Sequence, residues 1–143
     1  MKSKCLLVLL LERTAEARRW FSEAEWDYET ARDLHSMMRF NAACFYAQQA
    51  AEKAVKAALY MLGDVPLGHS IRELLERFSE ISGKNVNEIM PCARELDRHY
   101  IPARYPNAHP SGTPHEAYDR ETAGRALQCA ERILNYVRRF LGS

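Results

Sequence analysis

Four prolines between Ile101 and Tyr118 limit the regular structure that this chain can form. The segment reads IPARYPNAHPSGTPHEAY, and its prolines recur at every fourth position: Pro102, Pro106, Pro110 and Pro114. Each proline fixes φ and lacks a backbone N–H donor, so no α-helix can run through the segment. We therefore expect an ordered but irregular loop that separates one group of helices from a final helix.

The sequence before this loop predicts four helices. Apolar or small residues recur there at steps of three and four, over residues 15–38, 41–62, 71–82 and 87–100. Gly63 is placed to end the second helix, and Ser70 with Glu73 matches a capping box before the third. Pro91 suits the first turn of the fourth helix, because an N-terminal turn does not need its N–H.

The last helix is expected to begin at Asp119 as N-cap, or earlier at a Thr113–Glu116 capping box, and to reach the C-terminus. No stretch alternates apolar and polar residues as a strand does. The expected fold class is all-α, an up-and-down bundle of four long helices plus a short fifth. We divide the chain into an N-terminal extension, residues 1–14, and a single helical domain, residues 15–143.

The N-terminal extension contains a short apolar run. Lys2 and Lys4 precede the run Cys5–Leu11, and charges follow at once in Glu12 and Arg13. This pattern fits an extra stretch of helix, an appended segment, a start codon assigned too early, or a minimal signal peptide. The run is too short to span a bilayer, so we expect no membrane association.

The four cysteines show no metal-binding or disulfide pattern. Cys5, Cys44, Cys92 and Cys129 are widely separated, with no C-x-x-C pair. We expect reduced, mostly buried thiols in a cytoplasmic protein, and neither a metal nor another cofactor. The formal net charge is +1, so a role with RNA needs a local basic patch.

The proline loop holds side chains suited to phosphate and proton chemistry. Arg104, His109 and His115 lie in it, together with Tyr105 and Tyr118. Functional residues are concentrated in loops on rigid scaffolds. The alternative is a purely structural crossover, in which the arginine caps a carbonyl and the histidines lie in water.

Two lysines on the second helix are further candidates. Lys53 and Lys56 lie off its apolar face, and with Tyr105 they form our predicted nucleotide- or RNA-binding set. The alternative is a solvated helix edge on which Glu52 and Lys56 form an i,i+4 ion pair. His69, just before the third helix, is interpreted as a turn or capping residue.

Five pieces of the sequence occur in a familiar order. They are ARRWFSEAEWDYETA, FYAQQAAEKAVKAAL, the helix start His69-Ser70, ARYPNA, and a final A-x-x-A-L-x-x-A-x-x-I-L stripe. Together they resemble the HEPN family, the higher eukaryotes and prokaryotes nucleotide-binding domain, over about residues 17–141. The resemblance implies a helical bundle, usually a homodimer, often encoded beside a minimal nucleotidyltransferase antitoxin.

Many HEPN members are metal-independent ribonucleases with an R-x(4–6)-H motif, and Arg104 to His109 fits this motif with four intervening residues. The resemblance thus implies catalytic roles for both. An arginine can hold a phosphodiester oxygen and oppose charge in the transition state. A histidine can take the ribose 2′-hydroxyl proton or protonate the leaving oxygen. The alternative is a non-catalytic module that binds a nucleotide or a nucleotidyltransferase through the same loop and Lys53 and Lys56.

Overall fold

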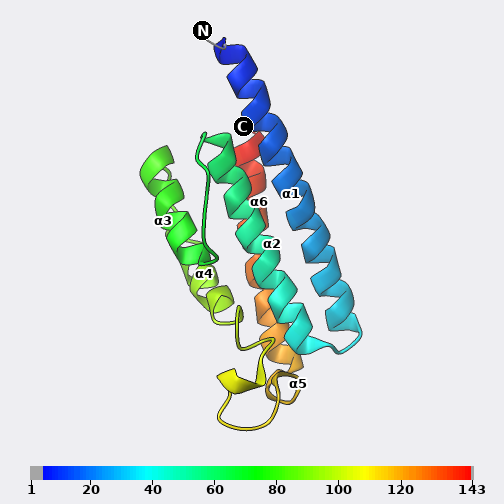
Figure 1. Cartoon of the computed structure of the whole chain (residues 1–143). Coiled ribbons are helices and arrows are strands. Elements are labelled where there is room, and N and C mark those ends of the chain that lie inside the picture. Colours follow the sequence, from blue (N-terminus) through cyan, green and yellow to red (C-terminus); the bar gives the residue numbers. More distant parts are fainter. Residues whose placement is uncertain (1–4, 143) are drawn as a thin grey trace.

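The computed structural model describes residues 5–142, and over this range the chain is helical with no β-strand. The long helices α1, α2 and α6 form the body, and the shorter α3 and α4 lie on the other side of α2 from α1 (Figure 1). Their bounds are Leu6–Ser36 for α1, Phe40–Met61 for α2, Ile71–Ser82 for α3, Met90–Asp97 for α4 and Arg120–Gly142 for α6. The predicted all-α bundle is confirmed.

Small side chains let α2 pack closely against its neighbours. Its buried alanines are Ala43, Ala47, Ala50, Ala51, Ala54, Ala57 and Ala58. On α1, the fully buried residues Ala17, Ala24 and Ala31 recur every seven positions and make one stripe. Larger side chains such as Leu59, Phe78 and Ile133 fill the core between the other helices. The core therefore combines a close α1–α2 seam, lined by alanines, with a region of larger side chains beneath α3 and α6.

The end of α2 is confirmed at the predicted glycine. Gly63 adopts φ +85°, a left-handed conformation that favours glycine. Its N–H bonds to the carbonyl oxygen of Tyr60 at 2.9 Å. A Cβ at this position would also lie 2.6 Å from the guanidinium carbon of Arg13. The left-handed backbone thus requires glycine here, and the flexible end of the Arg13 side chain would have to move to admit a Cβ.

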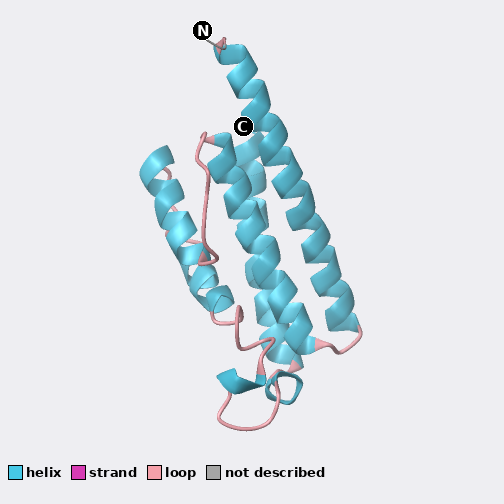
Figure 2. Cartoon of the chain, in the orientation of Figure 1, coloured by secondary structure: helices cyan, strands magenta, loops and turns pink. Residues whose placement is uncertain are grey.

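Helix α4 is shorter than the predicted span 87–100. It covers Met90–Asp97, with turns on both sides (Figure 2). At its end the Asp97 carboxylate accepts the backbone N–H groups of Ile71 at 2.7 Å and Arg72 at 3.1 Å, and the Ser70 hydroxyl at 3.0 Å. The end of α4 therefore caps the start of α3, in addition to Ser70, whose hydroxyl accepts the N–H of Glu73.

Both predicted starts of the last helix occur. Thr113 forms a complete capping box with Glu116 and begins the single turn α5 (Pro114–Ala117). Asp119 then accepts the N–H of Thr122 at 2.8 Å and caps α6. The proline loop thus contains one helix start and a 3-10 turn, η1 (Pro106–Ala108), and the second helix start follows directly at Asp119.

The N-terminal extension is helical from Leu6, so α1 runs continuously through residue 14. This agrees with the extra-helix interpretation; Lys2 and Lys4 lie outside the described residues. Its leucines are largely solvent-exposed, Leu6 by 84% and Leu11 by 59%, where α1 extends past the rest of the bundle (Figure 1). Between residues 5 and 142, no helix combines the length and apolar character needed to cross a membrane.

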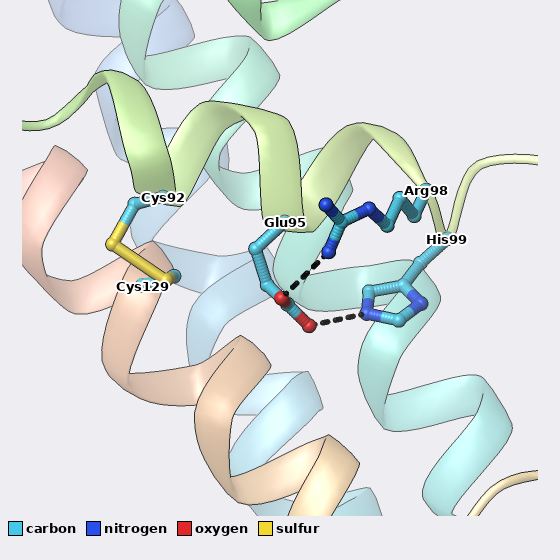
Figure 3. Close-up of a disulfide and its surroundings, with 5 residues drawn as sticks. All are labelled: Cys92, Glu95, Arg98, His99 and Cys129. Atoms are coloured by element: carbon cyan, nitrogen blue, oxygen red, sulfur yellow. Dashed lines mark hydrogen bonds and ion pairs between the residues drawn. A yellow bond between two sulfur atoms is a disulfide. The ribbon is translucent and has the colours of Figure 1, made fainter.

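The prediction of four reduced thiols is wrong for one pair. A disulfide joins Cys92 on α4 to Cys129 on α6, with the two Cα atoms 4.8 Å apart (Figure 3). The separation of 37 residues between them concealed the pair, because the contact arises only when α4 packs against α6. Cys44 is a buried free thiol and Cys5 an exposed one; burial raises the pKa of Cys44 to about 12.

Candidate active site

Arg104 lies in the turn that follows α4. Its Nε donates to the carbonyl oxygen of Tyr100 at 2.9 Å. Its guanidinium carbon lies over three aromatic rings, 4.4 Å from the centroid of Phe45, 4.7 Å from Tyr100 and 4.9 Å from Tyr105. Such contacts hold the guanidinium plane through cation–π attraction. The arginine does cap a carbonyl, as the structural alternative predicted.

The turn that presents Arg104 is anchored to the bundle. The neighbouring residue Ala103 is buried, and its carbonyl oxygen accepts the side-chain amide of Asn41 on α2 at 3.0 Å. Across residues 5–142, Arg104 forms no ion pair with a carboxylate. Its charge is therefore fixed in place and is not neutralised within this part of the chain.

His109 is half-buried, so the interpretation of a histidine in water is wrong for this residue. Its Nε2 lies 2.7 Å from the carbonyl oxygen of Pro102. A carbonyl oxygen only accepts hydrogen bonds, so Nε2 carries the proton and Nδ1 is the remaining ring nitrogen. The ring also contacts Tyr118 edge to face, with centroids 6.4 Å apart. The loop thus fixes both the tautomer and the plane of this imidazole.

The 3-10 turn η1 separates Arg104 from His109, and no hydrogen bond joins the two side chains within the described range. Each side chain instead bonds to a backbone carbonyl upstream of it, Tyr100 and Pro102. The R-x4-H pair is therefore held by the proline loop rather than by mutual contact.

Lys53 and Lys56 are both paired with carboxylates. Lys53 forms an ion pair with Asp27 on α1. Lys56 lies 3.0 Å from Glu52, which confirms the i,i+4 pair. The solvated edge is wrong, however, because Lys56 is only 7% exposed and Glu52 4%. Lys53 borders a surface groove between α1 and α2, about 720 Å³ in volume, that Trp20 also lines.

Sequence reasoning missed the role of His69 in this region. Its Nδ1 lies 3.1 Å from Glu52 Oε2, and its ring stacks on Tyr100 with centroids 4.7 Å apart. It does not cap α3, since Ser70 and Asp97 do so. The separation of 17 residues hid the contact with Glu52. The one sequence signal was the position of His69 just before a helix start.

Contacts that centre on Tyr100 therefore connect Arg104, Tyr105 and Lys56, whereas His109 contacts Pro102 and Tyr118 instead. The Tyr100 ring contacts both Arg104, on the proline loop, and His69. His69 in turn contacts Glu52, and Glu52 is paired with Lys56. Tyr105 also contacts Arg104. Lys53 lies apart from this cluster, on the α1 side of α2.

A second histidine missed by sequence reasoning is buried below the proline loop. His99 is 5% exposed, and its Nδ1 lies 2.9 Å from the hydroxyl of Tyr118. Burial lowers the pKa of His99, and the nearby Glu95 carboxylate, 3.4 Å from Nε2, partly opposes this shift (Figure 3). Burial also raises the pKa of Tyr118. Both side chains are thus held neutral near pH 7.

Comparison with known proteins extends over most of the chain. The model of the HEPN domain matches residues 17–140. A curated protein of Methanocaldococcus jannaschii, named "Putative toxin MJ1304", is 29% identical over 133 residues, with 87% of this chain and 88% of that protein covered.

Solved structures are also similar. TT1696 from Thermus thermophilus is 38% identical with a TM-score of 0.83, covering 87% of this chain and 97% of that one. ST0689, described as an archaeal HEPN homologue, is 39% identical with a TM-score of 0.75 and coverages of 88% and 98%. A HEPN domain protein of Thermotoga maritima is 34% identical, with a TM-score of 0.68 and coverages of 87% and 98%. Since the family model matches most of the sequence and these relatives have the same fold, the chain belongs to the HEPN domain family.

Proposed function

We propose that this HEPN protein is a toxin-type, metal-independent endoribonuclease in which Arg104 holds the scissile phosphate and His109 transfers a proton. The observation that carries the proposal is the state of Arg104. Its guanidinium is fixed by the Tyr100 carbonyl and by aromatic rings, while no carboxylate in residues 5–142 neutralises it. A preorganised, uncompensated cation is what stabilises the charge that develops on a phosphodiester.

The contacts of Arg104 leave donors for a substrate. Nε is used by Tyr100, and Nη1 has only a long contact of 3.5 Å with the Tyr105 hydroxyl. The remaining guanidinium N–H groups can bind two phosphate oxygens as a fork. Tyr105 is 47% exposed, so a base next to the phosphate can stack on it.

His109 suits the role of general acid. With Nε2 donating to Pro102, the protonated ring offers its Nδ1–H to the leaving 5′ oxygen. Proton transfer by an imidazole does not need a metal.

The comparisons support a toxin through the relative from Methanocaldococcus jannaschii, which is named "Putative toxin MJ1304". We extend the proposal to a homodimer and to neutralisation by a minimal nucleotidyltransferase antitoxin, acting in the cytoplasm where RNA is available. Lys53 and Lys56 stay predicted RNA-binding residues. Lys56 needs its pairing with Glu52 to open for direct contact, since both side chains are buried.

The test is incubation of purified protein with mixed-sequence RNA in EDTA, beside Arg104→Ala and His109→Ala. We expect cleavage that leaves 2′,3′-cyclic phosphate ends, reduced about 10²- to 10⁴-fold in each variant. The matched control is Arg132→Ala, which removes an exposed arginine from α6 and should cleave like the wild type.

Absence of cleavage by the wild-type protein, free of any antitoxin, would contradict the proposal. The same loop would then serve the alternative, a non-catalytic module that binds a nucleotide or a nucleotidyltransferase partner. Full activity in either variant would remove that residue from the mechanism. Sedimentation at micromolar concentration checks the dimer, and a monomer mass would count against a site shared by two protomers.

A further inference from the structure

We infer that His69 is a second catalytic residue, the general base that takes the 2′-hydroxyl proton, and that Glu52 is its positioning residue. This inference rests on the proposed ribonuclease function. It assigns the base to a residue outside the R-x4-H motif, 35 positions before Arg104 in the sequence.

The contact with Glu52 fixes which nitrogen of His69 is the base. Nδ1 lies 3.1 Å from Glu52 Oε2. A carboxylate accepts hydrogen bonds, so Nδ1 carries the proton and Nε2 presents its lone pair. The side chain of His69 is 57% exposed, which leaves the imidazole ring accessible to a substrate. A carboxylate behind an imidazole also stabilises the imidazolium that forms when the base takes a proton.

Several hydrogen-bond donors hold the buried side chain of Glu52. It is 4% exposed, and its Oε2 also accepts from Lys56 Nζ at 3.0 Å. Its Oε1 accepts from the amides of Gln48 at 3.2 Å and Gln49 at 3.4 Å. A buried carboxylate with a cation and amide donors around it has one orientation. It can therefore hold the imidazole in one tautomer.

The backbone at His69 is also fixed. Its carbonyl oxygen accepts the side-chain amide of Gln48 at 3.0 Å. Gly68, just before it, adopts φ +93° with open space around it, and Ser70, just after it, is held by Asp97. The contact with Gln48 on α2 and the Ser70–Asp97 bond thus hold the backbone at His69 next to α2.

Tyr100 brings this base and Arg104 together. The ring centroid of Tyr100 lies 4.7 Å from the His69 centroid and 4.7 Å from the guanidinium carbon of Arg104. The His69 centroid and the guanidinium carbon therefore lie no farther apart than the sum of these two distances. On this basis we assign the ribose of a phosphate bound by Arg104 to a position near His69.

The step balances without a cofactor. His69 Nε2 takes the proton of the 2′-hydroxyl as the 2′ oxygen forms a bond to phosphorus. The bond from phosphorus to the 5′ oxygen breaks, and that oxygen takes the Nδ1 proton of His109. The products are a 2′,3′-cyclic phosphate and a 5′-hydroxyl end. Acid and base return to their starting forms by exchanging a proton through water.

The test of the base is the His69→Ala variant in the RNA cleavage assay in EDTA. We expect a loss of about 10²- to 10⁴-fold, loss of the acidic limb of the pH profile of kcat/KM, and partial rescue by added imidazole. The control is His115→Ala, which removes an exposed histidine that contacts Thr113 and should change none of these. Circular dichroism checks that both variants are folded.

Wild-type cleavage that persists at full rate in His69→Ala would overturn this inference and leave the proposed function standing. Loss of activity with an unchanged pH profile and no imidazole rescue would also overturn it, because a structural role predicts that result. Absence of cleavage by the wild-type protein would overturn both proposals.

Glu52→Gln tests the positioning role. Removing the carboxylate charge should weaken the stabilisation of the imidazolium that forms when His69 takes a proton, so kcat should fall while KM stays near the wild-type value. A change in KM without a fall in kcat would contradict the assignment. Far-UV circular dichroism of the variant is needed, since Lys56 loses its partner.

Discussion

The disulfide between Cys92 and Cys129 ties the middle of α6 to α4, the helix whose last residue caps α3. In this way one covalent bond supports the segment that carries His69. The bond closes a loop that the unfolded chain would otherwise leave free. Its contribution should therefore appear as a loss of stability on reduction.

Reduction, or the Cys92→Ser substitution, should lower the free energy of unfolding by about 2–4 kcal/mol, given the length of the closed loop. Urea unfolding with and without reductant measures this. Cys5→Ser is the matched control, because Cys5 is an exposed free thiol, and it should leave stability unchanged. Alkylation of all four cysteines in unreduced, unfolded protein would contradict the disulfide.

The stability of the protein should fall as pH drops below about 6.5, the ordinary histidine pKa. Burial lowers the pKa of His99 in the folded state, against opposition from Glu95 and with support from Arg125 and Arg98. The unfolded chain, in which this histidine keeps its ordinary pKa, then binds more protons than the folded chain. The stabilisation is complete above that pH and is lost on acidification toward the lowered pKa.

Urea unfolding from about pH 8 to about pH 5 checks this dependence, with His99→Asn as the comparison. The difference in unfolding free energy between wild type and variant should shrink at acidic pH. His115→Ala should keep the wild-type dependence. If the unfolding free energy of the wild type exceeded that of His99→Asn by more at acidic pH than at about pH 8, a lowered pKa for His99 would be contradicted.

Arg104→Lys should behave much like Arg104→Ala in RNA cleavage. Lysine keeps the positive charge but loses the planar fork, the Nε bond to Tyr100 and the stacking on Phe45. We expect a loss of about 10²-fold or more in kcat/KM, as for removal of other preorganised donors. Arg132→Lys serves as control. Wild-type rates in Arg104→Lys would show that a point charge suffices.

Asp97→Ala should loosen the start of α3. The substitution leaves the N–H groups of Ile71 and Arg72 without their acceptor and should cost about 1–3 kcal/mol. Hydrogen exchange should accelerate at these two amides. Glu76→Ala, which removes an exposed partner of Arg72 on the same helix, should have little effect. Unchanged exchange at Ile71 would contradict the capping role.

The helix ends were predicted best from the sequence where one residue determines the local backbone conformation or caps the helix. Gly63, the Thr113 capping box and Asp119 each act through local geometry, and all three occur where predicted. The predicted span of α4 was too long at both ends. At its C-terminal end, the Asp97 carboxylate accepts from Ile71, 26 residues earlier, and local patterns do not contain such a partner.

Only part of the candidate site could be predicted from the sequence. Arg104 and His109 lie in one short motif, so spacing and resemblance could identify them. The contacts of His69 with Glu52 and Tyr100 join three separate segments and depend on how α2 packs. The burial of Lys56 was missed for the same reason, since an alternating charge pattern on a helix usually indicates solvent.

The alanines of α2 have a consequence for how this domain tolerates change. Ala24 on α1 and Ala51 on α2 are both fully buried. A larger side chain at either position must displace packed neighbours, at a cost of about 1–3 kcal/mol. Glycine would avoid the clash at a cost of up to about 1 kcal/mol in helix propensity. Along this seam, we therefore expect that only the smallest residues can be substituted without a loss of stability.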